Sequence, residues 1–268
     1  MYMKIYDCIT YFDEDLILKI RFNVLYNFVD KFIISEGAFN HRGIKRKLNF
    51  NIDNFKEFSK KIIYVPVDNF PNLNDPWDML KHQRNSSNKF LNELNKNDYV
   101  IVSDVDEIPN PSKILEFVNS NSNIGVFEQL MFYYKLNILN ETSPLWHGSK
   151  ICKYKYFKNP EWLRAYKSKQ YPWWRIDKPK NINILKDGGW HYSFLYNLEG
   201  IIKKISSYQH SEYDIEEIKN KDNLINKIKN KKDLFGRSYK YKSINLDKQT
   251  APDYIIDNWN DFHEWIDK

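Results

Sequence analysis

One run of residues constrains the fold more than any other. Residues 99–102, Tyr-Val-Ile-Val, lead directly into Ser-Asp-Val-Asp-Glu at 103–107. A short apolar run that ends at polar residues is typical of a strand buried on both faces of a sheet. Further strands are expected near residues 4–8, 32–34 and 62–65, with helices near 13–28 and 77–94 between them. This alternation predicts an α/β fold with a mostly parallel central sheet flanked by helices.

The acidic residues stand where such a sheet binds its ligands, beyond the carboxyl end of a strand. Asp104 and Asp106 are two residues apart, so both carboxylates can reach one divalent cation, or one a metal and the other a ribose. The structural alternative is an acidic turn that caps the helix expected from Ser112. The position after a buried strand makes the metal site as plausible as the turn.

The second half of the chain is less regular. We expect a strand over residues 124–134, loops and short strands over 146–179, and helices over 198–207 and 215–229. No internal repeat or low-complexity linker separates the halves. A chain of 268 residues with 42% hydrophobic residues is therefore predicted to form a single domain, 1–268.

Charge and cysteine content narrow the function classes. The formal net charge is +6, but the lysines are dispersed and no nucleic-acid-binding motif is visible, so we expect no nucleic-acid partner. Two cysteines imply no disulfide framework. No apolar stretch approaches the length of a signal sequence or a membrane span. We expect a soluble, cytoplasmic protein.

Four other polar positions are candidates for the site. Arg84, on the helix before the acidic run, could bind diphosphate oxygens, or could face solvent. Glu36 ends an early strand and could contact a nucleotide or an acceptor substrate. Residues 187–191, Asp-Gly-Gly-Trp-His, could bring a base, Asp187, and a metal ligand or acid/base group, His191, beside a close backbone approach. Glu212 beside His210 is a second candidate base, or part of a helix cap.

Aromatic residues make up 16% of the chain, and flat aromatic faces pack well on the apolar faces of sugars. For any single aromatic residue a place in the core is the more common outcome. Trp173, Trp174 and Trp190 are our candidates for a platform that binds a sugar acceptor.

The chain resembles glycosyltransferase family seventeen. The shared blocks lie in the family's order over residues 4–237, and the most specific of them is 101–109, Ile-Val-Ser-Asp-Val-Asp-Glu-Ile-Pro. The other blocks are residues 4–8, 29–37, 83–85, 189–193, 204–207 and 210–212.

The resemblance implies a GT-A-like fold and an inverting transfer from a UDP-sugar, with UDP-N-acetylglucosamine as the expected donor. It divides the domain into a nucleotide-sugar-binding half, 1–120, and an acceptor-binding half, 121–268. Mn²⁺ or Mg²⁺ is the implied cofactor. The metal ligands are expected from Asp104, Asp106 and His191, and the donor contacts from Glu36, Arg84, Ser103, Asp104 and Glu107.

We therefore expect a metal-dependent transferase that acts on a glycan or glycoconjugate hydroxyl, in microbial or viral glycan synthesis. Asp187 is the first candidate for the catalytic base and Glu212 the second, with His191 as a further catalytic candidate. Two alternatives stay open. A nucleotidyltransferase acting on sugar phosphates also places paired aspartates around metal ions, and a non-enzymatic glycan-binding domain would explain the aromatic content.

Overall fold

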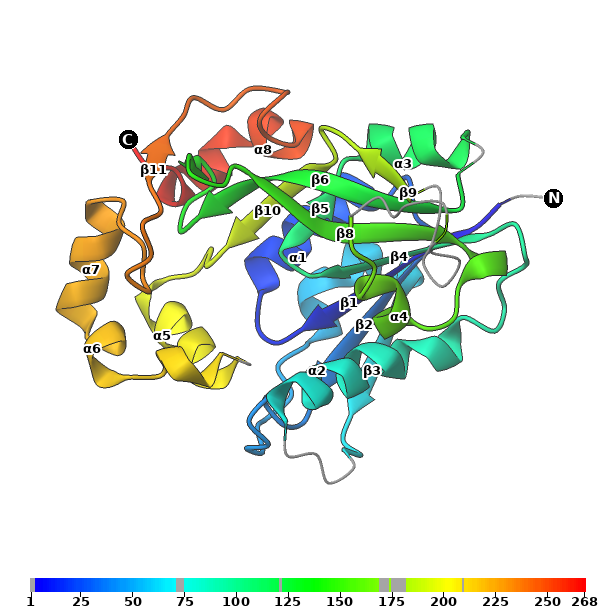
Figure 1. Ribbon diagram of the computed structural model, residues 1–268, viewed down its shortest axis with the longest axis horizontal. Coiled ribbons are helices and arrows are strands. Elements are labelled where there is room, and N and C mark those ends of the chain that lie inside the picture. The colour runs from blue at the N-terminus through cyan, green and yellow to red at the C-terminus, as the bar shows by residue number, and fades with distance from the viewer. Residues whose placement is uncertain (1–2, 71–74, 121, 169–173, 175–181, 209) are drawn as a thin grey trace.

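Four parallel strands form the first half of the sheet, as the apolar runs predict. The computed structural model describes residues 3–70, 75–120, 122–168, 174, 182–208 and 210–268. The strands are β1 (Ile5–Tyr11), β2 (Lys31–Gly37), β3 (Ile62–Val67) and β4 (Tyr99–Asp104). They lie in the order β3-β2-β1-β4 (Figure 1). Their carboxyl ends therefore meet at one edge, where the acidic residues begin.

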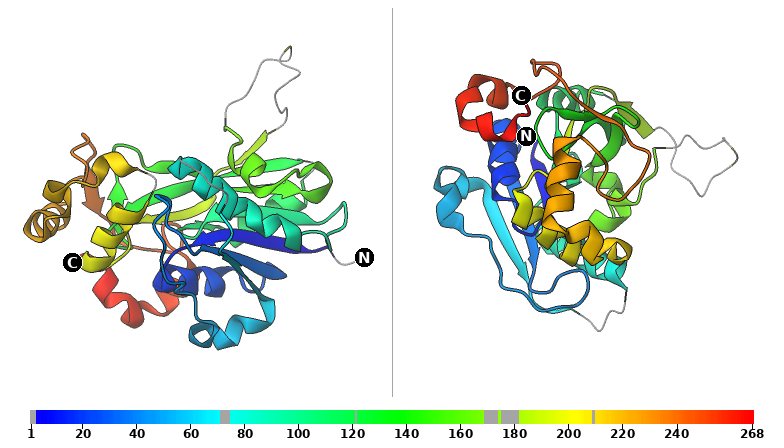
Figure 2. Two further views of the ribbon diagram at one scale, coloured as in Figure 1. Left: turned by 90° about the horizontal axis from the view of Figure 1, so that it is seen from below. Right: turned by 90° about the vertical axis from the view of Figure 1, so that its left-hand side faces the viewer.

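Helices cover both faces of this half, which confirms the expected layers (Figure 2). One face carries α1 (Asp15–Leu25) and the 3-10 helix η1 (Ile52–Lys61). The other face carries α2 (Pro76–Asn85), the 3-10 helix η2 (Ser86–Phe90) and α4 (Pro160–Arg164).

The pleat of β1 separates the two layers. Ile5 and Ile9 belong to the core beneath α1, whereas Tyr6 and Cys8 belong to the core beneath η2 and α4. Successive side chains of a strand point to opposite faces, so a continuous apolar run is needed to fill both layers.

The second half turns the parallel arrangement into a mixed sheet of eleven strands. Its strands are β5 (Glu107–Pro109), β6 (Ile124–Tyr133), β7 (Ile138–Asn140), β8 (Leu145–Lys153), β9 (Ile182–Leu185), β10 (Gly189–Ser193) and β11 (Tyr241–Ser243). β8 runs antiparallel to both β4 and β6 and joins the two halves. The α/β class is confirmed. The antiparallel pairs of β6, β7 and β8 arise because short connections cannot link parallel neighbours.

The helices of the second half form two groups. The first, α5 (Leu198–Ser207), α6 (Glu216–Lys219) and α7 (Lys221–Lys229), lies beyond one end of the sheet (Figure 1, left) and has its own hydrophobic cluster. The second, α8 (Asp253–Asp257) with η5 (Trp259–Trp265), packs back on the α1 side. The remaining short elements are α3 (Pro111–Val118), η3 (Tyr154–Tyr156) and η4 (Ser211–Tyr213).

Local capping explains where the predicted elements differ from the observed ones. The helix expected over 215–229 breaks at Asn220, whose side chain accepts from the Asn223 amide and starts α7. Residues 146–179, expected as loops and short strands, include all but the first residue of the nine-residue β8, and the helix α4. α4 begins because the Asn159 side chain caps it and Pro160 occupies its first turn.

A membrane-spanning helix is not found in the described part of the chain, where every helix is too short or too polar.

Candidate active site

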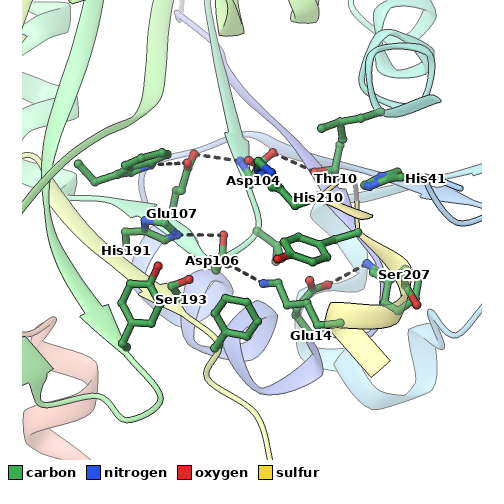
Figure 3. Close-up of a pocket in the computed structure, with 18 of the residues that line it drawn as sticks. Thr10, Glu14, His41, Asp104, Asp106, Glu107, His191, Ser193, Ser207 and His210 are labelled. Carbon is green, nitrogen blue, oxygen red and sulfur yellow. Dashed lines mark hydrogen bonds and ion pairs between the residues drawn. The ribbon is translucent and has the colours of Figure 1, made fainter. Parts of the chain in front are cut away.

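A cavity of about 360 Å³ opens at the carboxyl ends of β1 and β4 (Figure 3). The end of β1, the loop 39–46, β10 and α5 contribute to its walls. Its polar lining includes Thr10, Glu14, Asp104, Asp106, Glu107, His191, Lys204 and His210. The predicted acidic residues therefore lie in the cavity, and several of them lie together.

The acidic loop, residues 104–107, turns sharply because a strand begins directly after it. β4 ends at Asp104, and β5 starts at Glu107 and pairs with β10, so that Glu107 lies opposite His191. Gly189 allows this pairing. Its φ is +130°, and a Cβ there would stand 2.1 Å from the Ile108 carbonyl oxygen. The predicted close backbone approach is therefore to β5.

Asp104 is held by one hydroxyl and two guanidinium groups. Its Oδ1 accepts from Thr10 Oγ1 at 3.2 Å and Arg84 Nη2 at 3.1 Å, and its Oδ2 from Arg164 Nη2 at 2.8 Å. Burial raises the pKa of Asp104, but Arg164 and Arg84 lower it more strongly, so its pKa lies below the ordinary value. Asp104 is therefore ionised and fixed in orientation.

Glu107 lies deeper than Asp104, with its side chain 1% exposed. Its Oε1 accepts from Arg164 Nη2 at 2.6 Å and from Trp146 Nε1 at 2.7 Å, and its Oε2 accepts from the Asp104 amide at 3.1 Å. Arg164 thus joins both carboxylates. Through these contacts Glu107 fixes the conformation of the acidic loop.

Asp106 faces the opposite part of the cavity, toward α5 and β10 (Figure 3). Its Oδ2 lies 3.0 Å from Lys204 Nζ and its Oδ1 lies 3.7 Å from His191 Nε2. Burial raises the pKa of Asp106, but Lys204 and His191 together lower it by more, so its pKa lies below the ordinary value. For Lys204, burial lowers the pKa, and Asp106 and Glu14 raise it above the ordinary value. The pair is therefore ionised.

We call these three carboxylates and their cations the charged floor: Asp104, Asp106, Glu107, Arg84, Arg164 and Lys204. Every carboxylate of the floor contacts at least one cation. Buried carboxylates need such partners, because an unpaired buried charge is strongly destabilising.

Arg21 supports the floor from beneath, and the sequence analysis missed it. It is fully buried on α1 and pairs with Asp7 of β1 at 2.7 Å. It also donates to the Glu107 carbonyl at 2.6 Å and to Ser103 Oγ at 3.0 Å. A signal was available, because Arg21 lies in the helical stripe of apolar residues that includes Ile17 and Val24.

Arg164 and Trp146 were also missed. Both lie in the segment that was expected to be irregular, and their partner Glu107 is 57 and 39 residues away, respectively. The Arg164 carbonyl accepts from the buried Lys150 ammonium. Gly148 leaves no spare room behind the loop, since a Cβ there would lie 2.5 Å from Glu107 Cδ.

Three predicted donor-binding residues have internal partners. Arg84, buried on α2, bridges Asp104 and Glu161. Ser103 is fully buried, and its hydroxyl contacts Arg21 and Ser149. Glu36 is fully buried and anchors the loop after β2 by accepting from the amides of residues 49 and 50. None of the three is among the described residues that line the cavity.

The two predicted bases lie apart from each other. Asp187 is exposed on the turn between β9 and β10, where its carbonyl accepts from Asn110 Nδ2. Glu212 is also exposed, but its Oε1 lies 2.8 Å from His210 Nδ1. His210 lines the cavity, whereas the lining drawn from the described residues includes neither carboxylate. Only Glu212 is thus connected to the cavity, through an imidazole.

The predicted acceptor tryptophans do not form a platform in the described structure. Trp190 is 5% exposed and belongs to the main core, because it faces inward on β10. Trp174 is 63% exposed and does not line the cavity. Trp173 lies outside the described residues. Trp146 instead lines the cavity, with its ring 5.2 Å from His191.

An aromatic wall faces the charged floor. Its six members line the cavity and come from β6, from the residue after β10 and from the segments around α5 and β11. Five of them are linked by ring contacts; for example, the rings of Tyr213 and Phe235 are 4.2 Å apart. Arg237 covers the edge of the wall, 4.5 Å from the Tyr239 ring. The wall residues are Tyr133, Phe194, Tyr208, Tyr213, Phe235 and Tyr239.

Two side chains of the site, Asp106 and His191, are close enough to share a divalent metal. Asp106 Oδ1 and His191 Nε2 face each other across 3.7 Å. Both oxygens of Asp104 already accept hydrogen bonds. Among the described residues no three His, Cys, Asp or Glu side chains form a metal cluster. Substrate oxygens and water can complete such a shell.

The chain is similar to glycosyltransferases of one family. The model of glycosyltransferase family 17 matches residues 1–262. A Homo sapiens beta-1,4-mannosyl-glycoprotein 4-beta-N-acetylglucosaminyltransferase is 24% identical over 287 residues, which cover 94% of this chain and 52% of the relative. The Rattus norvegicus protein of the same name is 24% identical over 282 residues, or 92% and 51%. The chain thus spans about half the length of these curated relatives. By the extent of the family match, the chain belongs to glycosyltransferase family 17.

Proposed function

We propose that this chain transfers N-acetylglucosamine from a UDP-sugar to a glycan hydroxyl, with inversion at the anomeric carbon and with a divalent metal. One observation supports this most: the three carboxylates and Lys204 of the charged floor line the same cavity as the aromatic wall. Charged groups suit a diphosphate and aromatic faces suit a sugar. The names of the relatives support N-acetylglucosamine as the sugar.

Asp106 and His191 would hold the metal, Mn²⁺ or Mg²⁺. When bound, the metal would neutralise the negative charge that develops on the leaving diphosphate. Asp104 is one-third exposed and kept ionised by Arg84 and Arg164. Its remaining lone pairs can accept from a ribose hydroxyl. In this assignment the two aspartates of the loop have different tasks.

The acceptor hydroxyl must lose a proton as it attacks the anomeric carbon. We assign this proton transfer to His210, which lines the cavity, with Glu212 orienting its ring through the contact at 2.8 Å. A carboxylate behind an imidazole fixes its tautomer and stabilises its charged form. In this assignment the His210 imidazole takes the proton of the acceptor hydroxyl, and Glu212 takes part only by orienting the imidazole. We do not propose Asp187 as the base, because it is exposed on a turn and does not line the cavity.

The wall would bind the apolar face of a sugar. Its rings offer large flat surfaces at low conformational cost. Arg237 is held by Asp233 at 2.6 Å and stacks on Tyr239, so it fixes the outer rings. This surface and the relatives' names support a glycan or glycoconjugate as the acceptor.

A panel of sugar nucleotides tests the proposal. The protein is incubated with each donor and Mn²⁺, and nucleotide release is measured with and without EDTA. Release from UDP-N-acetylglucosamine that EDTA abolishes is the expected result, and NMR of the glycan product should show an inverted anomeric configuration. Absence of binding and hydrolysis for every donor, under every metal condition, would overturn the proposal. Transfer of the nucleotide instead of the sugar would identify a nucleotidyltransferase.

A further inference from the structure

The side chain of Lys204 occupies an unusual place for a helix lysine. It reaches from α5 into the cavity, and its ammonium lies 3.0 Å from Asp106 Oδ2. The rings of Phe194 and Tyr196 flank it at 5.4 and 5.3 Å. The side chain is only 19% exposed. A positive charge is thus built into the site, against the carboxylate that is the proposed metal ligand.

The rest of the floor is paired in the same way. Asp104 and Glu107 share Arg164, and Asp104 also has Arg84. Without substrate, no carboxylate of the acidic loop lacks a cationic partner. A divalent cation that binds alone would therefore meet Lys204 at close range in a poorly hydrated site, where like charges repel strongly. A diphosphate changes this balance, because it brings negative oxygens that can accept from the ammonium.

We propose that Lys204 is an internal counter-ion that couples metal binding to nucleotide binding. Its ammonium neutralises Asp106 while no nucleotide is bound. When diphosphate oxygens accept hydrogen bonds from the ammonium instead, the Asp106 carboxylate becomes free to bind the metal. The inference rests on the proposed function of the cavity. It assigns Lys204 a positioning role and makes the metal and the nucleotide bind as a unit.

The affinity of each ligand, measured with and without the other, tests this coupling. Mn²⁺ binding is followed by the electron paramagnetic resonance signal of the free ion, and UDP binding by calorimetry. In the wild type we expect UDP to strengthen Mn²⁺ binding by roughly tenfold or more, and Mn²⁺ to strengthen UDP binding by the same factor. Wild-type affinities that are independent of each other would overturn the proposal without any variant.

The variant Lys204→Met removes the charge and keeps the length of the side chain. We expect it to bind Mn²⁺ alone roughly tenfold more tightly than the wild type, while the coupling factor between Mn²⁺ and UDP falls clearly below the wild-type value, because only the direct attraction between metal and diphosphate remains. The matched control is Lys203→Met on the same helix. Lys203 is 49% exposed, pairs with Asp13 and does not line the cavity, so its loss should leave Mn²⁺ affinity and coupling unchanged.

Two results separate a merely structural role from this proposal. If Lys204 only anchors α5, Lys204→Met lowers the melting temperature but keeps wild-type Mn²⁺ affinity and coupling, and the proposal fails. Lys204→Arg keeps the charge and should keep the coupling. Loss of coupling in that folded variant would also overturn it. If the wild type binds Mn²⁺ and UDP in no combination, the proposed function itself fails, which is a different outcome from binding without coupling.

Discussion

The charged floor and the aromatic wall form two sides of one cavity, but they are stabilised differently. The floor is assembled from α2, α4, α5 and the acidic loop, and its atoms are fixed by ion pairs of 2.6–3.1 Å. The wall consists of rings that contact one another at 4.2–6.4 Å, with few directed bonds. The floor therefore holds groups in defined positions, whereas the wall presents a broad apolar surface.

This difference matches two tasks. Charge stabilisation at a leaving group requires preorganised groups that do not move during the reaction. Binding a sugar face requires area and tolerates small displacements. We therefore expect substitutions in the floor to affect stability and turnover, and substitutions in the wall to affect substrate affinity.

The largest effect is expected from Arg21→Met beneath the floor. The substitution leaves the fully buried Asp7 without its partner and removes the donor to the Glu107 carbonyl. Breaking a buried ion pair from one side costs about 3–5 kcal/mol of unfolding free energy. Urea denaturation measures this loss.

The control for Arg21 is Lys19→Met, an exposed position on the same helix, where a change within about 0.5 kcal/mol is expected. A loss below about 1 kcal/mol for Arg21→Met would show that the floor does not depend on this support.

The second prediction concerns turnover. Asp106→Asn keeps the shape of the side chain but removes its charge, so kcat should fall by roughly 10²–10³-fold. The matched control is Asp187→Asn, whose carboxylate is exposed on the β9–β10 turn, and it should retain near-normal kcat. The reverse ranking in a steady-state transfer assay would place the reaction away from the floor.

Parts of this contrast could be predicted from the sequence. The apolar run of β4 fills two core layers, so the strand and the acidic loop that follows it could be predicted from the sequence. The helix α5 was predicted with its observed bounds. The side chains that bind the acidic loop could not be predicted from the sequence. Arg164 reaches Glu107 across 57 residues, and periodicity within one segment carries no information on such contacts.

The wall was harder to predict than the floor. Composition indicated many aromatic residues, but Trp190 packs in the core while Tyr239 lines the cavity. Which aromatic residues face a ligand depends on how β6, β10 and the α5–α7 segment meet, and this packing is tertiary. The same limit applies to the candidate bases, because the sequence does not show that His210 lines the cavity while Asp187 lies on an exposed turn.

A third prediction uses pH to test the charge on the floor. The folded pKa of Asp106 is lowered, so its ion pair stabilises the fold above the ordinary carboxyl pKa of about 4, and this contribution is lost as the pH falls toward the folded pKa. The difference in unfolding free energy between wild type and Asp106→Asn should be on the order of 1–2 kcal/mol larger at pH 6 than at pH 2.5.

Urea denaturation at several pH values measures this difference. A gap between the two proteins that stays constant from pH 6 to pH 2.5 would mean that the ionised form of Asp106 contributes nothing to stability.

The smallest effect is expected in the wall. Tyr239→Ala removes one ring that lines the cavity, so the KM for the acceptor should rise roughly three- to tenfold while kcat changes little. Tyr156→Ala is the control, because Tyr156 is 41% exposed and does not line the cavity. A fall in kcat without a change in KM would assign this part of the wall to the reaction itself.

The separate hydrophobic cluster of α5 and α7 has a consequence for how such enzymes diverge. Most wall residues belong to this cluster or pack against it, and it is distinct from the two cores that hold β1 and β4. Mutations in the wall can therefore accumulate without disturbing the packing beneath the acidic loop. Under the proposed function, substitutions of wall rings that leave Lys204 and His210 in place would change the glycan that is accepted while the contacts to the donor stay the same.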